Sequence, residues 1–189
     1  MEIKNFIKVY DEVMPWNVLL NLIKFAKNSN FEESKIDGGG QSRTDFNIRR
    51  TYVFPLSNLS NSLSCVHWFN LLYSYFHGNL QRFQKDTKTL DFAFKEITSI
   101  EILKYENTGF YTWHVDHFAS IPRTMSCILT LNNDYEGGNL CFRNPDGTGE
   151  WEIQVKPNRM IIWPSNFLFP HTVKPVTKGL RYSVVAWAL

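Results

Sequence analysis

The sequence predicts a mainly β fold, a β-sandwich or jelly roll with helices packed on one sheet. Two segments of helical periodicity lie in the N-terminal half, and the C-terminal half alternates short runs of β-forming residues with turn residues. The 189 residues, 43% of them hydrophobic, suffice for one domain with its own core. We therefore expect a single domain over 1–189, with a helical support region over 1–96 and the jelly-roll core over 97–189.

Two helices are expected, over 15–28 and 60–84. Pro15 suits the first turn of the first helix, and apolar residues recur every three or four positions in both segments. Between them, three consecutive glycines at 38–40 lie in a polar stretch over 32–47 and predict a mobile loop. This loop is either a lid over a site or a plain connection.

The strands are predicted from runs of β-branched and aromatic residues bounded by turn residues. A short strand over 50–54 should end at Pro55. The strands expected after it cover 97–105, 124–131, 139–142, 151–156, 160–163 and 181–188. Gly137 and Gly138 fit a tight turn that requires positive φ.

Charge and cysteine content limit the function classes. The net charge is +2 and there is no run of five like charges, so we do not expect a nucleic-acid partner. The three cysteines, Cys65, Cys127 and Cys141, have no metal-binding spacing and are expected to be buried free thiols in a reducing compartment. With no signal-peptide pattern and no long apolar run, we expect a cytoplasmic protein without a membrane partner.

A candidate metal site comes from two segments that are far apart in the chain. His114 and Asp116 are two positions apart, so on an extended segment their side chains face the same way. His171 opens a later extended run. Two imidazoles and one carboxylate can bind one face of Fe(II) and leave the other face open. An HxD pair alone is weak, and a buried structural histidine is the alternative for His171.

Four ordered blocks, 105–116, 123–132, 135–140 and 157–187, carry a resemblance to a known family. Over about half its length the chain resembles the 2-oxoglutarate and Fe(II)-dependent dioxygenases, and within them the prolyl 4-hydroxylase group. The resemblance implies a double-stranded β-helix. It also implies Fe(II) as cofactor, 2-oxoglutarate and O₂ as cosubstrates, and ascorbate as a reductant.

The resemblance assigns roles to individual residues. The family's metal ligands match His114, Asp116 and His171, and its cosubstrate anchor matches Arg181, whose guanidinium would pair with the distal carboxylate of 2-oxoglutarate. Ser183 should share the strand face of Arg181.

Two further residues are expected near the cosubstrate. Tyr105 matches a pocket tyrosine, with one residue of gap in the alignment. Thr130 departs from the pattern, because the oxygen-sensing prolyl hydroxylases have a tyrosine there that hydrogen-bonds the cosubstrate.

Tyr111 matches a tyrosine that lines the cosubstrate and substrate pocket of the resembled group, and Arg123 and Trp187 match positions that flank its target proline. The expected activity is therefore hydroxylation of a prolyl residue in a flexible peptide or protein segment, with decarboxylation of 2-oxoglutarate to succinate. Two alternatives remain open. One is a dioxygenase that acts on a free amino acid, another side chain or a nucleobase, and the other is a non-catalytic metal-binding sandwich. The sequence leaves the oligomeric state open.

Overall fold

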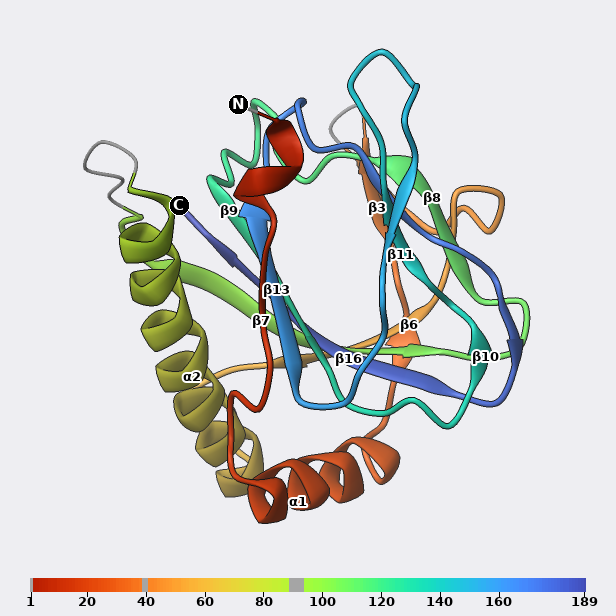
Figure 1. The fold of residues 1–189 in the computed structure, drawn as a ribbon. Helices are drawn as coiled ribbons and strands as arrows, with labels where there is room; N and C mark the ends of the chain where they lie inside the picture. Colours follow the sequence, from red (N-terminus) through yellow and green to blue (C-terminus); the bar gives the residue numbers. More distant parts are fainter. Residues whose placement is uncertain (1, 39–40, 89–93) are drawn as a thin grey trace.

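The computed structural model describes residues 2–38, 41–88 and 94–189 as two facing antiparallel sheets with two helices on the outer side of the larger sheet (Figure 1). The strand order of the larger sheet is β1-β13-β9-β16-β7-β6-β2, and that of the smaller sheet is β12-β11-β14-β8-β5. This arrangement confirms the predicted jelly roll with N-terminal helices packed on one sheet.

The bounds of the elements follow the predicted pattern closely in the C-terminal half. The larger sheet contains β1 (Lys8–Tyr10), β2 (Glu32–Glu33), β6 (Tyr52–Leu56), β7 (Ile97–Tyr105), β9 (Met125–Thr130), β13 (Arg159–Pro164) and β16 (Arg181–Ala188). The smaller sheet contains β5 (Arg49–Arg50), β8 (Phe110–His114), β11 (Leu140–Phe142), β12 (Trp151–Ile153) and β14 (His171–Val173). Two short pairs are β3 (Ile36–Gly38) with β4 (Gln41–Arg43), and β10 (Glu136–Gly137) with β15 (Val176–Lys178).

The central strands β9 and β16 of the larger sheet are buried on both faces, which explains why they are rich in apolar residues. In β16, Tyr182, Val184 and Ala186 belong to the core between sheet and helices, whereas Val185 and Trp187 belong to the core between the two sheets. Side chains of a strand alternate between faces, so Arg181 and Ser183 point to the same inter-sheet side as Val185 and Trp187. This alternation selects the residues that can form a site between the sheets.

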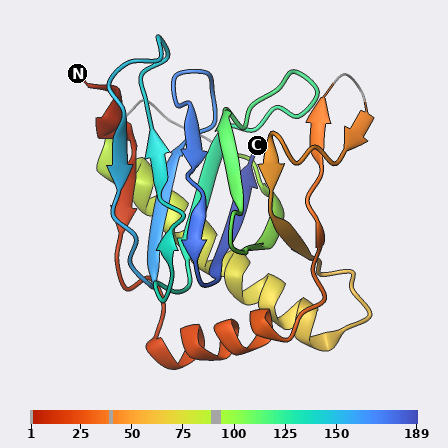
Figure 2. The same ribbon diagram turned by 90° about the vertical axis from the view of Figure 1, so that its right-hand side faces the viewer.

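The helices α1 (Trp16–Lys27) and α2 (Leu63–Thr87) cover the outer face of the larger sheet. In α2, Leu72, Phe76 and Leu80 are at most 1% exposed against that face, and Ser62 caps the helix by accepting a 3.4 Å hydrogen bond from the Cys65 amide. Figure 2 shows α1 lying across the end of the sheet, below α2. A short 3₁₀ turn (Ile3–Phe6) precedes β1.

Two predictions for the region between the helices are wrong. Pro55 does not end a strand, because it lies inside β6 opposite Glu101 of β7. β2 pairs only with Tyr52 and Val53, so no partner on that side of β6 needs an amide from Pro55. The polar stretch over 32–47 contains β2 and the β3–β4 pair rather than a single loop. Residues 39 and 40 of the glycine run lie outside the described residues.

The segment before residue 97 is part of both sheets. β1, β2 and β6 belong to the larger sheet and β5 to the smaller one, in addition to the two helices. The three cysteines are buried and free, as expected. Within the described ranges no helix is long and apolar enough to cross a membrane.

Candidate active site

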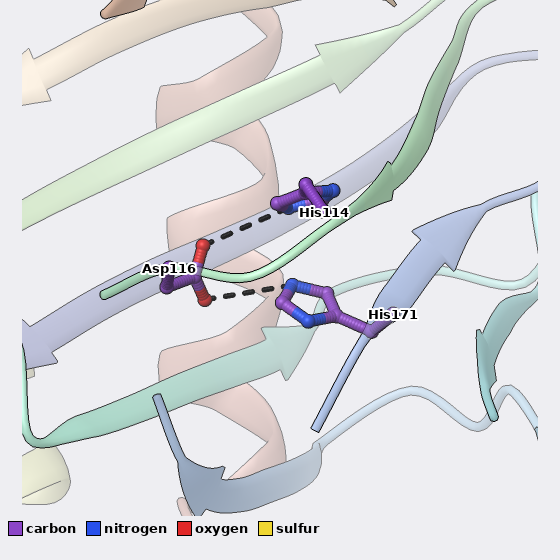
Figure 3. Close-up of side chains that lie close together, drawn as sticks. All are labelled: His114, Asp116 and His171. Atoms are coloured by element: carbon purple, nitrogen blue, oxygen red, sulfur yellow. Dashed lines mark ion pairs between the residues drawn. The ribbon is translucent and has the colours of Figure 1, made fainter. Parts of the chain in front are cut away.

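His114, Asp116 and His171 converge between the two sheets. His114 ends β8 and His171 begins β14, and the two residues are direct partners in the antiparallel pairing of these strands. Asp116 lies just beyond β8, with Oδ1 3.6 Å from Nε2 of His114 and Oδ2 3.4 Å from Nε2 of His171 (Figure 3). One ligand atom from each residue lies within 4.8 Å of the others, so a single cation can contact all three.

Backbone carbonyls fix the orientation of both imidazoles. Nδ1 of His114 lies 2.7 Å from the carbonyl oxygen of Thr112, and Nδ1 of His171 lies 3.1 Å from that of Phe169. A carbonyl only accepts, so each Nδ1 carries the proton and each Nε2 keeps its lone pair. In metal-binding histidines the ring nitrogen that does not bind the metal typically donates a hydrogen bond to such a carbonyl.

The protonation states also suit metal binding. Burial, reinforced by the neighbouring His171, lowers the pKa of His114 to about 3, so its imidazole is neutral at physiological pH. Burial alone would raise the pKa of Asp116, but His171, His114 and a hydrogen bond from Ser126 together lower that pKa. Two neutral imidazoles and one carboxylate form the donor set that divalent iron accepts as a facial triad.

Ser126 and Ser165 support the carboxylate, and the sequence patterns did not single them out. The Ser126 hydroxyl donates a 2.7 Å hydrogen bond to Oδ2 of Asp116, and the hydroxyls of Ser126 and Ser165 are 2.7 Å apart. Both serines are buried. The available signal was alternation in β9, which places Ser126 on the same face as Ile128.

A cavity of about 320 Å³ opens beside the triad. The Tyr111 ring stacks on His114, with centroids 3.5 Å apart and planes 17° apart. The guanidinium carbon of Arg49 lies over the Tyr111 ring, 4.8 Å from its centroid. Burial raises the pKa of Tyr111 to about 12, so its hydroxyl is a neutral donor. Arg49 also lines the cavity, and sequence patterns did not indicate it.

Arg123 and Trp187 form one flat side of the same cavity. The Arg123 guanidinium carbon lies 3.8 Å from the centroid of the Trp187 ring, which is cation–π geometry. Both residues line the cavity together with the triad. The structure thus brings Tyr111, Arg123 and Trp187 to one opening.

Arg181 lies deeper, at the other end of the inter-sheet space, and is 1% exposed. Its Nη1 donates a 3.1 Å hydrogen bond to the Ser183 hydroxyl, and its guanidinium carbon is 4.9 Å from the Tyr105 ring centroid. Nε and Nη2 are buried without a hydrogen-bond acceptor among the described residues. A buried cation with unused donors suits an anionic ligand.

Thr130 pairs with Ser183 across β9 and β16, but its hydroxyl is directed elsewhere. It donates to backbone carbonyls, those of Lys156 and Arg159, where a tight turn brings both oxygens close to β9. Its one proton is therefore used within the fold. This placement leaves Thr130 without a donor for a cosubstrate.

Comparison with known proteins agrees with this geometry. Residues 100–189 match the model of the 2OG-Fe(II) oxygenase superfamily. PKHD-type hydroxylases are similar over part of the chain. One from Alteromonas mediterranea is 35% identical in an alignment of 94 positions that covers 44% of this chain and 40% of that protein. One from Synechococcus sp. is 36% identical in an alignment of 97 positions that covers 49% of this chain and 42% of that protein. Each match covers less than half of the relative.

Solved structures share the fold across almost the whole chain. A prolyl hydroxylase from Trichoplax adhaerens, in complex with a hypoxia inducible factor peptide fragment, has a TM-score of 0.76 at 15% identity. The match covers 98% of this chain and 84% of that one. A prolyl-4-hydroxylase from Pseudomonas putida has a TM-score of 0.70 at 16% identity, covering 97% and 92%. At this identity the likeness concerns the fold.

Proposed function

Because residues 100–189 match the model of the 2OG-Fe(II) oxygenase superfamily, we propose that this chain is an Fe(II)- and 2-oxoglutarate-dependent dioxygenase that hydroxylates a prolyl residue in a peptide or protein. The reaction consumes O₂ and 2-oxoglutarate, inserts one oxygen atom into a C–H bond of the substrate, and releases succinate and CO₂. The observation that carries the proposal is the triad of His114, Asp116 and His171 with the unpaired Arg181 deeper in the same inter-sheet space.

The residues fit the cofactor and the cosubstrate. His114, Asp116 and His171 would hold Fe(II), which when bound supplies the O₂ chemistry. Arg181, with Ser183 at its side, would pair with the distal carboxylate of 2-oxoglutarate through two parallel hydrogen bonds. The ring of Tyr105 packs against Arg181 and lines the cavity, so it would border the cosubstrate. Ascorbate belongs to the proposal as the reductant that keeps the iron ferrous.

The open end of the cavity supports a prolyl substrate. The Trp187 ring would offer an apolar wall to a pyrrolidine ring, Arg123 would bind a peptide carbonyl, and Tyr111 would face the substrate beside His114. Lys35 and Ile36, at the base of the β3–β4 pair, also border the opening. The structural neighbours support the same class, since the two named above are prolyl hydroxylases. We further propose a single catalytic domain that acts in the cytoplasm on a flexible proline-containing segment.

The test measures succinate formation by anaerobically Fe(II)-loaded protein with a panel of prolyl peptides. The variants are His114→Ala and Arg181→Ala, and the control is His77→Ala on α2, where the imidazole stacks on Tyr73 away from the cavity. We expect His114→Ala to lose metal binding and turnover, and Arg181→Ala to keep metal but lose 2-oxoglutarate binding. The control should retain both.

The outcomes separate the alternatives. Metal binding without any 2-oxoglutarate turnover would favour a non-catalytic metal site. If a free amino acid, another side chain or a nucleobase stimulated turnover and no prolyl peptide did, the reaction class would stand and the substrate assignment would change. Unchanged metal affinity in His114→Ala would refute the ligand assignment.

A further inference from the structure

The buried guanidinium of Arg181 has more donors than the fold uses. Ser183 takes one hydrogen bond from Nη1, and Nε and Nη2 have no acceptor in the described part of the chain. Within that part no carboxylate forms an ion pair with Arg181. An unpaired buried charge is strongly unfavourable, so this end of the inter-sheet space is built to receive an anion.

A second unused donor lies beside it, the hydroxyl of Tyr135. This oxygen is buried, and no hydrogen bond of good geometry reaches it in the part of the chain that the structure describes. Arg181 lowers the pKa of Tyr135 by its charge and by donating toward the phenol oxygen, which leaves the O–H proton itself unused. Burial raises the pKa of Tyr135 more than Arg181 lowers it, so the hydroxyl stays protonated at neutral pH and can donate.

Two glycines leave room for the Tyr135 and Arg181 side chains to pack close together. A Cβ on Gly138 would lie 2.9 Å from Cδ of Arg181 and 3.2 Å from Cε2 of Tyr135, so both side chains pack over the bare Gly138 backbone. A Cβ on Gly179 would lie 3.1 Å from Cβ of Tyr135. Both glycines have positive φ, +64° and +81°, which other residues rarely adopt. The close approach of phenol and guanidinium is thus a feature of the backbone here.

The Thr130 hydroxyl is not available as a donor beside Arg181. Its hydroxyl is directed to the Lys156 and Arg159 carbonyls, as described above. Tyr105 packs on Arg181 and lines the cavity of the triad, so Arg181 lies next to that cavity. The Tyr135 ring and the Arg181 side chain both lie over Gly138, which places the phenol at the Arg181 end of the inter-sheet space.

We propose that the Tyr135 hydroxyl is the second donor, beside Arg181, for the distal carboxylate of 2-oxoglutarate. Two adjacent buried donors without an acceptor converge on an oxyanion, and a carboxylate presents two oxygens that satisfy both. The assignment rests on the proposed function, and it makes Tyr135 a determinant of selectivity for dicarboxylic over monocarboxylic 2-oxo acids.

The test is calorimetric titration of Mn(II)-loaded protein, without O₂, with 2-oxoglutarate and with 2-oxobutyrate, which keeps the 2-oxo acid end and lacks the distal carboxylate. The variant Tyr135→Phe removes only the hydroxyl. The matched control is Tyr182→Phe, next to Arg181 in sequence but on the helix-facing side, where its ring lies near Phe31. Arg181→Gln serves as the reference for loss of the charged anchor.

We expect Tyr135→Phe to weaken 2-oxoglutarate binding about tenfold or more and to change 2-oxobutyrate binding less than about twofold. Tyr182→Phe should leave both constants unchanged. The preference for 2-oxoglutarate is the dissociation constant of 2-oxobutyrate divided by that of 2-oxoglutarate. This ratio does not depend on the folded fraction, so partial misfolding of the variant cannot imitate the result. If Tyr135→Phe kept the preference of the wild type while Arg181→Gln lost it, the role of Tyr135 alone would be overturned. A wild-type protein that does not prefer 2-oxoglutarate would overturn the proposed function as well.

Discussion

The hydroxyl of Ser126 donates a hydrogen bond of 2.7 Å to Oδ2 of Asp116, and both groups are buried. The bond joins β9 of the larger sheet to the segment after β8 of the smaller sheet. It fixes the carboxylate so that its oxygens face the two imidazoles, and Ser165 in turn holds Ser126.

Removing this support should weaken the metal site without abolishing it. We expect Ser126→Ala to lower the affinity for Fe(II) or Mn(II) about 10- to 100-fold, because the ligand carboxylate loses its orientation. Competition with a calibrated chelator measures the affinity. Ser74→Ala is the control, because that exposed serine donates to the Asn70 carbonyl of its own helix. Equal affinities in wild type and Ser126→Ala would show that the fold positions Asp116 unaided.

A methyl group at Gly138 should damage the proposed cosubstrate site around Arg181. Gly138 has φ of +64°, and an added Cβ would lie 2.9 Å from Cδ of Arg181 and from Cγ2 of Val176. We expect Gly138→Ala to lose about 1–3 kcal/mol of unfolding free energy and to weaken 2-oxoglutarate binding. Urea titration and calorimetry measure the two effects.

The same substitution, glycine to alanine, should have the opposite effect on stability at Gly78 in α2. A Cβ there meets nothing within 4 Å, and the residue has helical surroundings. Gly78→Ala should raise the free energy of unfolding by about 0.5–1 kcal/mol, because alanine restricts the unfolded chain and favours the helix. Urea titration of this variant serves as the control for Gly138→Ala. A loss of stability at Gly78 would mean that α2 is not a regular helix at this point.

The packing of α2 on the larger sheet should contribute strongly to stability. Phe76 is fully buried against the sheet, so Phe76→Ala should cost about 3–5 kcal/mol through lost contacts and a residual cavity. Leu63, at the start of the same helix, is 86% exposed, and Leu63→Ala should change stability by less than about 0.5 kcal/mol. Chemical denaturation measures both. Similar values for the two variants would contradict the docking of α2 through Phe76.

The ion pair between Asp11 and Arg159 ties the segment after β1 to β13. Nε and Nη2 of Arg159 donate to the two carboxylate oxygens at 2.7 and 2.9 Å, and these hydrogen bonds lower the pKa of Asp11. Because the carboxylate is 38% exposed, we expect Asp11→Asn to cost only about 0.5–1 kcal/mol at pH 7. The measurement is denaturation of both proteins as a function of pH.

The pH dependence of this difference follows from the direction of the shift. The folded protein binds the Asp11 proton less readily than the unfolded chain, so the pair stabilises the fold above the unfolded pKa of about 3.9. The advantage of wild type over Asp11→Asn should be constant near neutral pH and disappear as the pH falls through the folded pKa. A difference that persists unchanged in acid would show that the pair is not its source.

Local patterns sufficed for much of the fold. The bounds of β7 and β16 agree with the predicted segments, because both are rich in β-forming residues and are bounded by turns. Only β16 is buried on both faces. Pro55 within β6 was not predictable, since its tolerance depends on how far the neighbouring β2 extends. The β3–β4 pair was missed for a different reason: polar, glycine-containing strands carry little periodic signal in the sequence.

By itself the sequence determined the residue types and spacings of the site. His114 and Asp116 are close in the chain, so local geometry joins them, and the ordered blocks up to Arg181 determined which chemistry to expect. Only the tertiary structure decided what surrounds them. It placed His171 opposite His114 in register, set Ser126 on Asp116, directed Thr130 to backbone carbonyls, and brought Tyr135 against Arg181. These contacts join residues on different strands, and strand register and backbone close approach depend on packing of the whole domain.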